Sequence, residues 1–196
     1  MNLVSGRVRS VMATLEARDA ADRTDGTPQE LRLRAIRPEV GQMLVTLIVA
    51  TGARTIVEVG TSSGYSTLYL ASGARRTGGR VVTYEVDPAK VELAGGSFAD
   101  AGVDDIVELR HADGVAGLAS IAGRADLVFL DAEKGDYLGA LGPAIEALRP
   151  GGLLVADNLI SHEADLAGFR EAALSDTRLV GLVVPIGRGE LVAARL

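Results

Sequence analysis

The stretch at residues 55–66 constrains the fold more than any other part of this chain. It begins with β-branched residues that favour a strand, passes through a turn with two glycines and leads into an apolar helical face. Such a unit belongs to open α/β sheets, in which ligands bind outside the carboxyl ends of the strands. We therefore expect this turn to form the floor of a pocket, with Glu58 at its edge.

Strand and helix patterns alternate along the rest of the chain. Strands are predicted at residues 55–59, 80–85, 105–110, 126–130, 152–156, 178–184 and 189–195, and helices at 2–18, 38–51, 64–73, 88–101, 115–121, 136–148 and 163–174, with a short helix around 29–34 and a loop at 19–28. The alternation predicts a seven-stranded, mostly parallel α/β sheet with helices on both faces, and the short last connection predicts an antiparallel C-terminal hairpin. The length favours one domain over residues 1–196, with a helical extension at 1–34 and a ligand-binding core at 35–196.

Composition and charge exclude several classes of function. The net charge is −6 and no basic run could follow a phosphate backbone, so we do not expect nucleic-acid binding. Cysteine is absent, which excludes disulfides and thiolate metal sites. The longest apolar stretch, residues 43–50, is far too short to cross a membrane, and the N-terminus lacks an apolar signal core. We expect a cytoplasmic protein whose apolar N-terminal helices support a homodimer.

Acidic side chains stand at the predicted ends of the second and third strands. Glu85 ends the second strand, where a carboxylate can accept both hydroxyls of a ribose. Asp113 follows the third, where it could accept from an adenine amino group or cap the next helix. The first turn does not match the dinucleotide fingerprint, because Ser62 stands where the middle glycine belongs. A nucleoside ligand without phosphates is therefore favoured over NAD.

Oxygen-bearing side chains also follow the fourth and fifth strands. Asp131 comes after the fourth, and Asp157 and Asn158 come after the fifth. Two carboxylates and one amide form an all-oxygen set that suits Mg²⁺, Mn²⁺ or Ca²⁺ better than zinc. Three protein ligands leave positions open for a substrate with two neighbouring oxygens, and Lys134 is close enough in sequence to help deprotonate it.

These motifs, in this order, resemble a known family. The chain is similar to the cation-dependent, S-adenosylmethionine-dependent O-methyltransferases, the group that contains the catechol and caffeoyl-CoA O-methyltransferases. The resemblance runs from about residue 35 to the C-terminus. It is carried by Ile36 with Pro38-Glu39-Val40-Gly41-Gln42, Glu58-Val59-Gly60 with Gly64-Tyr65-Ser66, Tyr84-Glu85-Val86-Asp87, Asp131-Ala132-Glu133-Lys134 with Tyr137, Leu148-Arg149-Pro150-Gly151-Gly152, and Asp157-Asn158.

The resemblance implies a class I methyltransferase fold and a role for each matching residue. The methionine part of the cofactor would be held by Glu58, Gly60, Thr61 and Ser66, the ribose by Glu85, and the adenine would border Asp113 and Gly114, with Ile36 closing over the site. The cation, Mg²⁺ first among the three, would be bound by Asp131, Asp157 and Asn158, which also places Asp131 beside the cofactor. Lys134 would be the general base for methyl transfer to a small, catechol-like acceptor with vicinal oxygens.

Several features leave the substrate and two other functions open. Only residues 159–162 separate Asn158 from the next predicted helix, where the family often carries a longer cover, and no tryptophan offers a stacking wall. Glu190 is a weak counterpart of the acidic partner that the catechol enzyme offers a substrate hydroxyl. A non-catalytic cofactor-binding protein of the same fold is one alternative. An esterase is the other, since residues 60–64 match G-x-S-x-G and Ser62, Asp131 and His162 occur in triad order.

Overall fold

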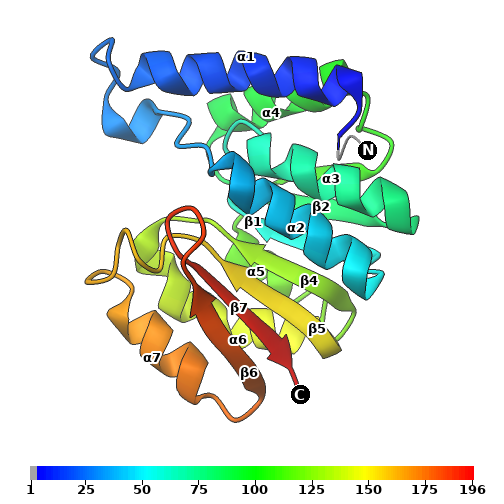
Figure 1. The fold of residues 1–196 in the computed structure, drawn as a ribbon, viewed down its shortest axis with the longest axis vertical. Helices are drawn as coiled ribbons and strands as arrows, with labels where there is room; N and C mark the ends of the chain where they lie inside the picture. The colour runs from blue at the N-terminus through cyan, green and yellow to red at the C-terminus, as the bar shows by residue number, and fades with distance from the viewer. Residues whose placement is uncertain (1–3) are drawn as a thin grey trace.

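The computed structural model describes residues 4–196 and contains a seven-stranded sheet (Figure 1). The strands are β1 (Thr55–Val59), β2 (Arg80–Glu85), β3 (Val107–His111), β4 (Ala125–Leu130), β5 (Leu148–Ala156), β6 (Leu179–Val184) and β7 (Glu190–Arg195). Their order is β3-β2-β1-β4-β5-β7-β6, with parallel pairing up to β5 and antiparallel pairing of β7 with both β5 and β6. The predicted mixed sheet with an antiparallel C-terminal hairpin is confirmed.

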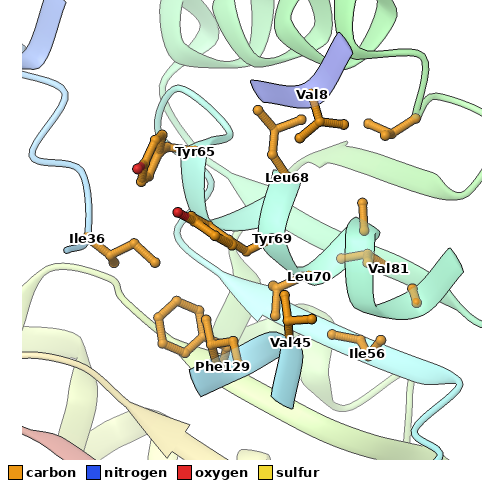
Figure 2. Packing of buried hydrophobic residues seen from close by; sticks show 14 of the residues in the cluster. Val8, Ile36, Val45, Ile56, Tyr65, Leu68, Tyr69, Leu70, Val81 and Phe129 are labelled. Carbon is orange, nitrogen blue, oxygen red and sulfur yellow. The ribbon is translucent and has the colours of Figure 1, made fainter. Parts of the chain in front are cut away.

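Helices cover the two faces of the sheet in separate layers. One layer holds α1 (Gly6–Asp22), α2 (Pro38–Thr51), α3 (Tyr65–Thr77) and α4 (Pro88–Ala101), and the other α5 (Gly114–Leu118), α6 (Tyr137–Ala147) and α7 (Ala167–Ser175). Successive strand residues alternate between the layers, so that Ile56 packs under the first and Val57 under the second. Figure 2 shows Val45 from α2 and Leu70 from α3 packed against Ile56 in the first layer. Along residues 4–196, no helix has the length and apolar character needed to span a membrane.

Local chemistry sets most helix boundaries where the sequence places them. Pro38 stands in the first turn of α2, and Gly52, with a left-handed φ of 66°, ends it. Asp87 caps α4 by accepting from the amide of Ala89 at 2.8 Å. These signals depend on neighbouring residues only, which is why the sequence pattern identifies them.

The N-terminal helix departs from the prediction. Its predicted residues 2 and 3 lie outside the described residues, and α1 continues to Asp22 where a loop was expected from residue 19. Two acidic residues of the predicted loop tie the helix to the segment that follows it. Asp19 accepts from the amide of Ala35 at 3.2 Å, and the buried Asp22 accepts from the amide of Leu33 at 3.2 Å.

Other boundaries shift by a few residues. The chain enters β5 at Leu148, because Leu148 pairs with Ala125 and Arg149 donates to Asp126 at 2.5 Å, so the predicted turn at 149–152 belongs to the strand. α7 begins at Ala167 rather than at 163, after a segment of turns. α5 ends at Leu118 and β3 begins at Val107, and the short helices are η1 (Gln29–Leu31) and η2 (Lys134–Asp136).

Candidate active site

A cavity of about 490 Å³ lies at the carboxyl ends of the parallel strands. Its size falls within the range of small-molecule sites, and its position is the one expected for an open α/β sheet. Ten of the twelve predicted site residues line it: Ile36, Gly60, Thr61, Ser66, Glu85, Asp113, Gly114, Asp131, Lys134 and Asn158. The structure therefore brings both predicted halves of the site into one cavity. Glu58 and Asp157 do not line it.

Backbone hydrogen bonds continue one residue past the strand ends and hold this edge of the sheet in place. The amide of Gly60 donates to Tyr84 at 3.1 Å, that of Asp131 to Val59 at 3.0 Å, and that of Asp157 to Leu130 at 3.1 Å. The residues that follow β1, β4 and β5 are thus fixed by the main chain, and their side chains start from defined positions.

Gly60 is required by a close approach between two of these segments. Its φ is +99°, and a Cβ built on it would lie 2.2 Å from the carbonyl oxygen of Asp131. No side chain fits in this space, and L residues rarely adopt this φ. The turn after β1 and the residue after β4 are therefore in contact through their backbones.

Glu58 lies beneath the floor of the cavity rather than at its edge, contrary to the prediction. Its side chain is fully buried and accepts hydrogen bonds from Ser66 at 2.5 Å, Thr67 at 2.5 Å and Thr83 at 2.6 Å. Thr61, which does line the cavity, contacts the Thr83 hydroxyl at 2.6 Å. Burial raises the pKa of Glu58 to about 7, although these three hydroxyls lower it. Glu58 thus positions Ser66 and Thr61 from below.

Glu85 is pre-organised by the turn opposite it. One carboxylate oxygen accepts from the amides of Val86 at 2.9 Å and Asp87 at 3.0 Å, and the other accepts from the amide of Ser62 at 2.8 Å. Because each carboxylate oxygen can accept two hydrogen bonds, the oxygen facing Ser62 keeps one acceptor position. Glu85 is only 8% exposed and lines the cavity, so a group bound there could use this acceptor position.

Asp113 and Gly114 close the same end of the cavity. Asp113 caps α5, accepting from the amides of Val115 at 2.8 Å and Ala116 at 3.4 Å, and it lines the cavity as well. The capping interpretation is therefore confirmed, while contact with an adenine stays a prediction. Gly114 is kept small by its neighbours, since a Cβ there would lie 2.7 Å from Val59.

The opposite end of the cavity holds Asp131, Lys134 and Asn158. The Asn158 amide nitrogen donates to Asp131 at 3.1 Å, and the Lys134 ammonium lies 3.8 Å from the same carboxylate oxygen. Lys134 also donates to the Ala132 carbonyl at 3.1 Å and lies over the Tyr137 ring. Burial and the Asp157 carboxylate raise the pKa of Asp131 to about 7, against the effect of Lys134.

Asp157 lies behind Asn158, next to a buried glutamate that the sequence marked only weakly. It accepts from the amide of Asn158 at 2.7 Å and is 1% exposed. Glu190 is fully buried, and neither of its oxygens has a hydrogen-bond partner among the described residues. Burial and the carboxylates of Asp157 and Asp131 raise the pKa of Glu190 to about 11. This part of the site carries more buried acid than its protein surroundings neutralise.

The chemistry of the three predicted metal ligands suits a hard cation. Asp131, Asp157 and Asn158 can supply carboxylate and amide oxygens, and the buried Glu190 beside them, whose oxygens have no hydrogen-bond partner among the described residues, adds an acidic group that is held protonated. Within residues 4–196, no three acidic or histidine side chains converge as a metal-binding group, so the expected site depends on the amide of Asn158. Its nitrogen faces Asp131, and ligation requires the amide to turn its oxygen inward.

The segment that includes Ile36 forms a strap across the cavity. Ser62 donates from its hydroxyl to the Leu33 carbonyl at 2.9 Å, and Arg34 pairs with Glu133 on the opposite wall. Ile36 is 4% exposed and lines the cavity, as predicted. The strap is thus attached to the turn after β1 and to the segment after β4. Sequence reasoning did not identify the Arg34–Glu133 pair, because the two residues are far apart in the chain.

The structure does not assemble the serine triad that the sequence left open. The Ser62 hydroxyl is used by Leu33, and His162 contacts the neighbouring Ser161 hydroxyl at 3.0 Å. Ser62 therefore has no histidine base among the described residues, and the esterase interpretation is not supported.

Comparisons with known proteins agree with this geometry. A family model described as O-methyltransferase matches residues 17–189. The chain belongs to the S-adenosylmethionine-dependent O-methyltransferase family. A catechol O-methyltransferase of Mycobacterium tuberculosis is 38% identical over 164 residues, which cover 83% of this chain and 70% of that protein. The resemblance seen in the sequence is confirmed.

Solved structures of O-methyltransferases share the fold. The enzyme from Bacillus cereus, solved in complex with SAH, superposes with a TM-score of 0.80 at 26% identity, over 95% of this chain and 91% of that one. The enzyme TomG of Streptomyces achromogenes, in complex with SAM, gives 0.78 at 25% identity, over 98% and 99%. The class I methyltransferase fold expected from the resemblance is confirmed.

Proposed function

We propose that this O-methyltransferase uses S-adenosylmethionine and a divalent cation to methylate a hydroxyl of a small, catechol-like acceptor with a second oxygen next to it. The observation that supports this most is the single cavity that has Glu85 at one end and Asp131, Lys134 and Asn158 at the other. A nucleoside cofactor and a vicinal diol would then lie side by side across the Gly60 turn.

The cofactor end offers contacts for each part of S-adenosylmethionine. The free acceptor position of Glu85 suits a ribose hydroxyl, and Asp113 with Gly114 borders the space for the adenine. Thr61 and Ser66, supported by Glu58 from below, face the methionine part. Ile36 in the strap excludes water from above.

The acceptor end would hold the cation through Asp131, Asp157 and Asn158. When bound, Mg²⁺ (or Mn²⁺ or Ca²⁺) lowers the pKa of the acceptor hydroxyl and orients its oxygens. Lys134, as the neutral amine, would take up the hydroxyl proton, and its contacts with Asp131 and with the Tyr137 ring limit where its amino group can lie. Methyl transfer then depends largely on the alignment of the acceptor oxygen with the methyl donor, which the rigid strand ends provide.

Titration calorimetry with S-adenosylhomocysteine tests the cofactor half of the proposal. We expect wild type to bind and Glu85→Ala to bind at least about tenfold more weakly, since a hydrogen-bonded buried carboxylate is worth more than about 1.4 kcal/mol. Glu171→Ala is the matched control, because Glu171 is an exposed acid on α7 and does not line the cavity. Equal weakening in both variants would contradict the assignment.

Turnover tests the acceptor half. Methylation of catechol should require added Mg²⁺, stop with a chelator, and fall at least about a hundredfold in Lys134→Met. Tight binding of S-adenosylhomocysteine without turnover on any vicinal diol would favour the non-catalytic alternative. Chelator-insensitive turnover would refute the dependence on a divalent cation while leaving the O-methyltransferase assignment intact.

A further inference from the structure

Arg188 lines the acceptor end of the cavity, and the proposed function does not use it. It lies in the short connection between β6 and β7, a segment that the sequence pattern identifies only as a hairpin turn. Its side chain is half-buried, and it lines the same cavity as Asp131, Asn158 and His162. The end of the cavity that would hold the acceptor therefore has a cation beyond Lys134.

The hairpin turn is fixed by its main chain against the segment that follows Asn158. The carbonyl of Arg188 accepts from the amides of Ile160 at 3.0 Å and Ser161 at 2.9 Å, and the carbonyl of Gly189 accepts from Leu159 at 2.8 Å. Gly189 has a φ of +91°, and a Cβ there would lie 2.3 Å from the Ile160 side chain. The backbone of Arg188 thus has one position relative to the cavity, and only a glycine beside it permits that position.

The guanidinium of Arg188 differs from those of the other arginines around the cavity. Arg23 pairs with Asp19 at 2.7 Å, Arg32 donates to the Thr27 carbonyl at 2.8 Å, and Arg34 pairs with Glu133. Among residues 4–196, the Arg188 guanidinium has no hydrogen bond and no ion pair. It acts only over longer range, lowering the pKa of Asp131 and of Glu190.

A half-buried guanidinium in a ligand cavity is suited to bind an anion. Its planar fork of donors matches a carboxylate in two parallel hydrogen bonds, and it stays charged at every relevant pH. The remaining polar groups at this end, Asp131 and Asn158 with Lys134, are engaged with one another. Arg188 is the cation there whose donors remain available to a ligand.

We propose that Arg188 binds a carboxylate on the acceptor and makes the enzyme prefer dihydroxylated aromatic acids over neutral vicinal diols. This inference rests on the proposed function, since it assigns the second contact of the same acceptor. The vicinal oxygens would lie at Asp131 and Asn158, and the carboxylate would point away from them toward the β6–β7 turn. A competing explanation is that Arg188 only balances the charge of Asp131 and Glu190.

Matched acceptors distinguish the two explanations. We would measure kcat/KM for 3,4-dihydroxybenzoate and for 3,4-dihydroxybenzyl alcohol. The two compounds share the catechol ring, and the alcohol has a neutral hydroxymethyl group where the acid has its carboxylate. Wild type should prefer the acid, and Arg188→Gln should lower the ratio of acid to alcohol at least about tenfold, mainly through the KM of the acid. Arg188→Lys keeps the charge without the fork and should give an intermediate ratio.

Arg178→Gln is the control, because it removes the same charge from an exposed residue that pairs with Asp176 and does not line the cavity. It should leave the ratio unchanged. A wild type without preference for the acid, or an equal fall for both acceptors in Arg188→Gln, would overturn the proposal.

Binding measurements keep this inference separate from the proposed function. Calorimetric titration of 3,4-dihydroxybenzoate and the alcohol into protein saturated with S-adenosylhomocysteine needs no turnover. If wild type methylates neither compound, the proposed function fails, and the titration still decides the role of Arg188. The carboxylate contact is refuted if wild type binds the acid and the alcohol with equal affinity. It is also refuted if a folded Arg188→Gln variant binds the acid as tightly as wild type does.

Discussion

The buried Glu58 makes the stability of this protein depend on pH in a way that one substitution can isolate. Its pKa in the folded protein is about 7, compared with 4.5 for a glutamate in water. Between these values the folded state binds more protons than the unfolded state, so the free energy of unfolding falls as pH rises. The part of the unfolding free energy that depends on the protonation of Glu58 therefore decreases gradually from pH 4.5 to 7 and changes little above pH 7.

The size of the effect follows from the two pKa values. A shift from 4.5 to about 7 corresponds to about 3 kcal/mol in total, of which about 2.5 kcal/mol lies between pH 5 and pH 8. Glu58→Gln cannot ionise and keeps nearly the same shape. The difference in unfolding free energy, wild type minus variant, should therefore decrease by about 2.5 kcal/mol from pH 5 to pH 8.

Urea unfolding followed by circular dichroism at pH 5, 6, 7 and 8 provides this difference. Groups that titrate in the same window without contact to Glu58 are present in both proteins and cancel, whereas the pKa of Asp131 is raised in part by the Glu58 charge, so the measured difference includes this coupling. Loss of hydrogen bonds to Ser66, Thr67 and Thr83 shifts the variant by an amount that varies little with pH. A difference that stays within about 0.5 kcal/mol across the range would refute the assignment of a raised pKa to Glu58.

Three further substitutions test the Gly60 turn, the Tyr137 hydroxyl that joins the ends of β4 and β5, and the exposed side of α2. Gly60→Ala should lower the free energy of unfolding by about 2 kcal/mol or more, because its methyl group meets the Asp131 carbonyl; an unchanged urea midpoint would disagree with the close approach. Tyr137→Phe removes a hydroxyl that lies within 3.2 Å of the carbonyls of Leu130 and Asp157. We expect the free energy of unfolding to fall by about 1 kcal/mol in the same urea assay, and an unchanged value would show that the contact is dispensable. We propose that two copies pair through the apolar N-terminal helices, where Val49 of α2 is 47% exposed, so Val49→Lys should give a monomer in light scattering; a monomeric wild type would exclude the homodimer.

Patterns that depend on near neighbours in the sequence predict much of this protein. The β-branched run before Gly60, the cap at Asp87 and the glycine at Gly52 define elements almost to the residue. The strand ends that carry Glu85 and Asp131 meet in one cavity because parallel strands end at one edge of the sheet.

The placement of Glu58 at the edge of the cavity was the main error in the site, and the sequence contained a signal against it. Alternation along β1 places Glu58 on the same face as Ile56, beneath α3. Hydroxyl groups surround that position, two from the first turn of α3 and one from Thr83, which is its register partner on β2. A buried carboxylate with these neighbours is satisfied by them and does not reach the ligand.

The positions of Arg188 and Glu190 depend on contacts that no local pattern encodes. Both belong to the β6–β7 hairpin, which reaches the site only because β7 pairs with β5 and the turn is bound to residues 159–161. The turn residues suit any hairpin, so their sequence specifies the turn but not the surface that it meets.

Asp131 connects the two halves of the site more directly than any other residue. Its carbonyl lies against Gly60 in the cofactor turn, and its carboxylate contacts Asn158 and faces Lys134 at the acceptor end. Its amide is held by Val59, which prevents the residue from moving without β1. Because one backbone unit reaches both ends of the cavity, the distance between the proposed cofactor and acceptor positions would be set by the sheet itself rather than by a flexible loop. Strain introduced at the Gly60 turn must therefore act on both ligands, whereas a change at Arg188 can act on the acceptor alone.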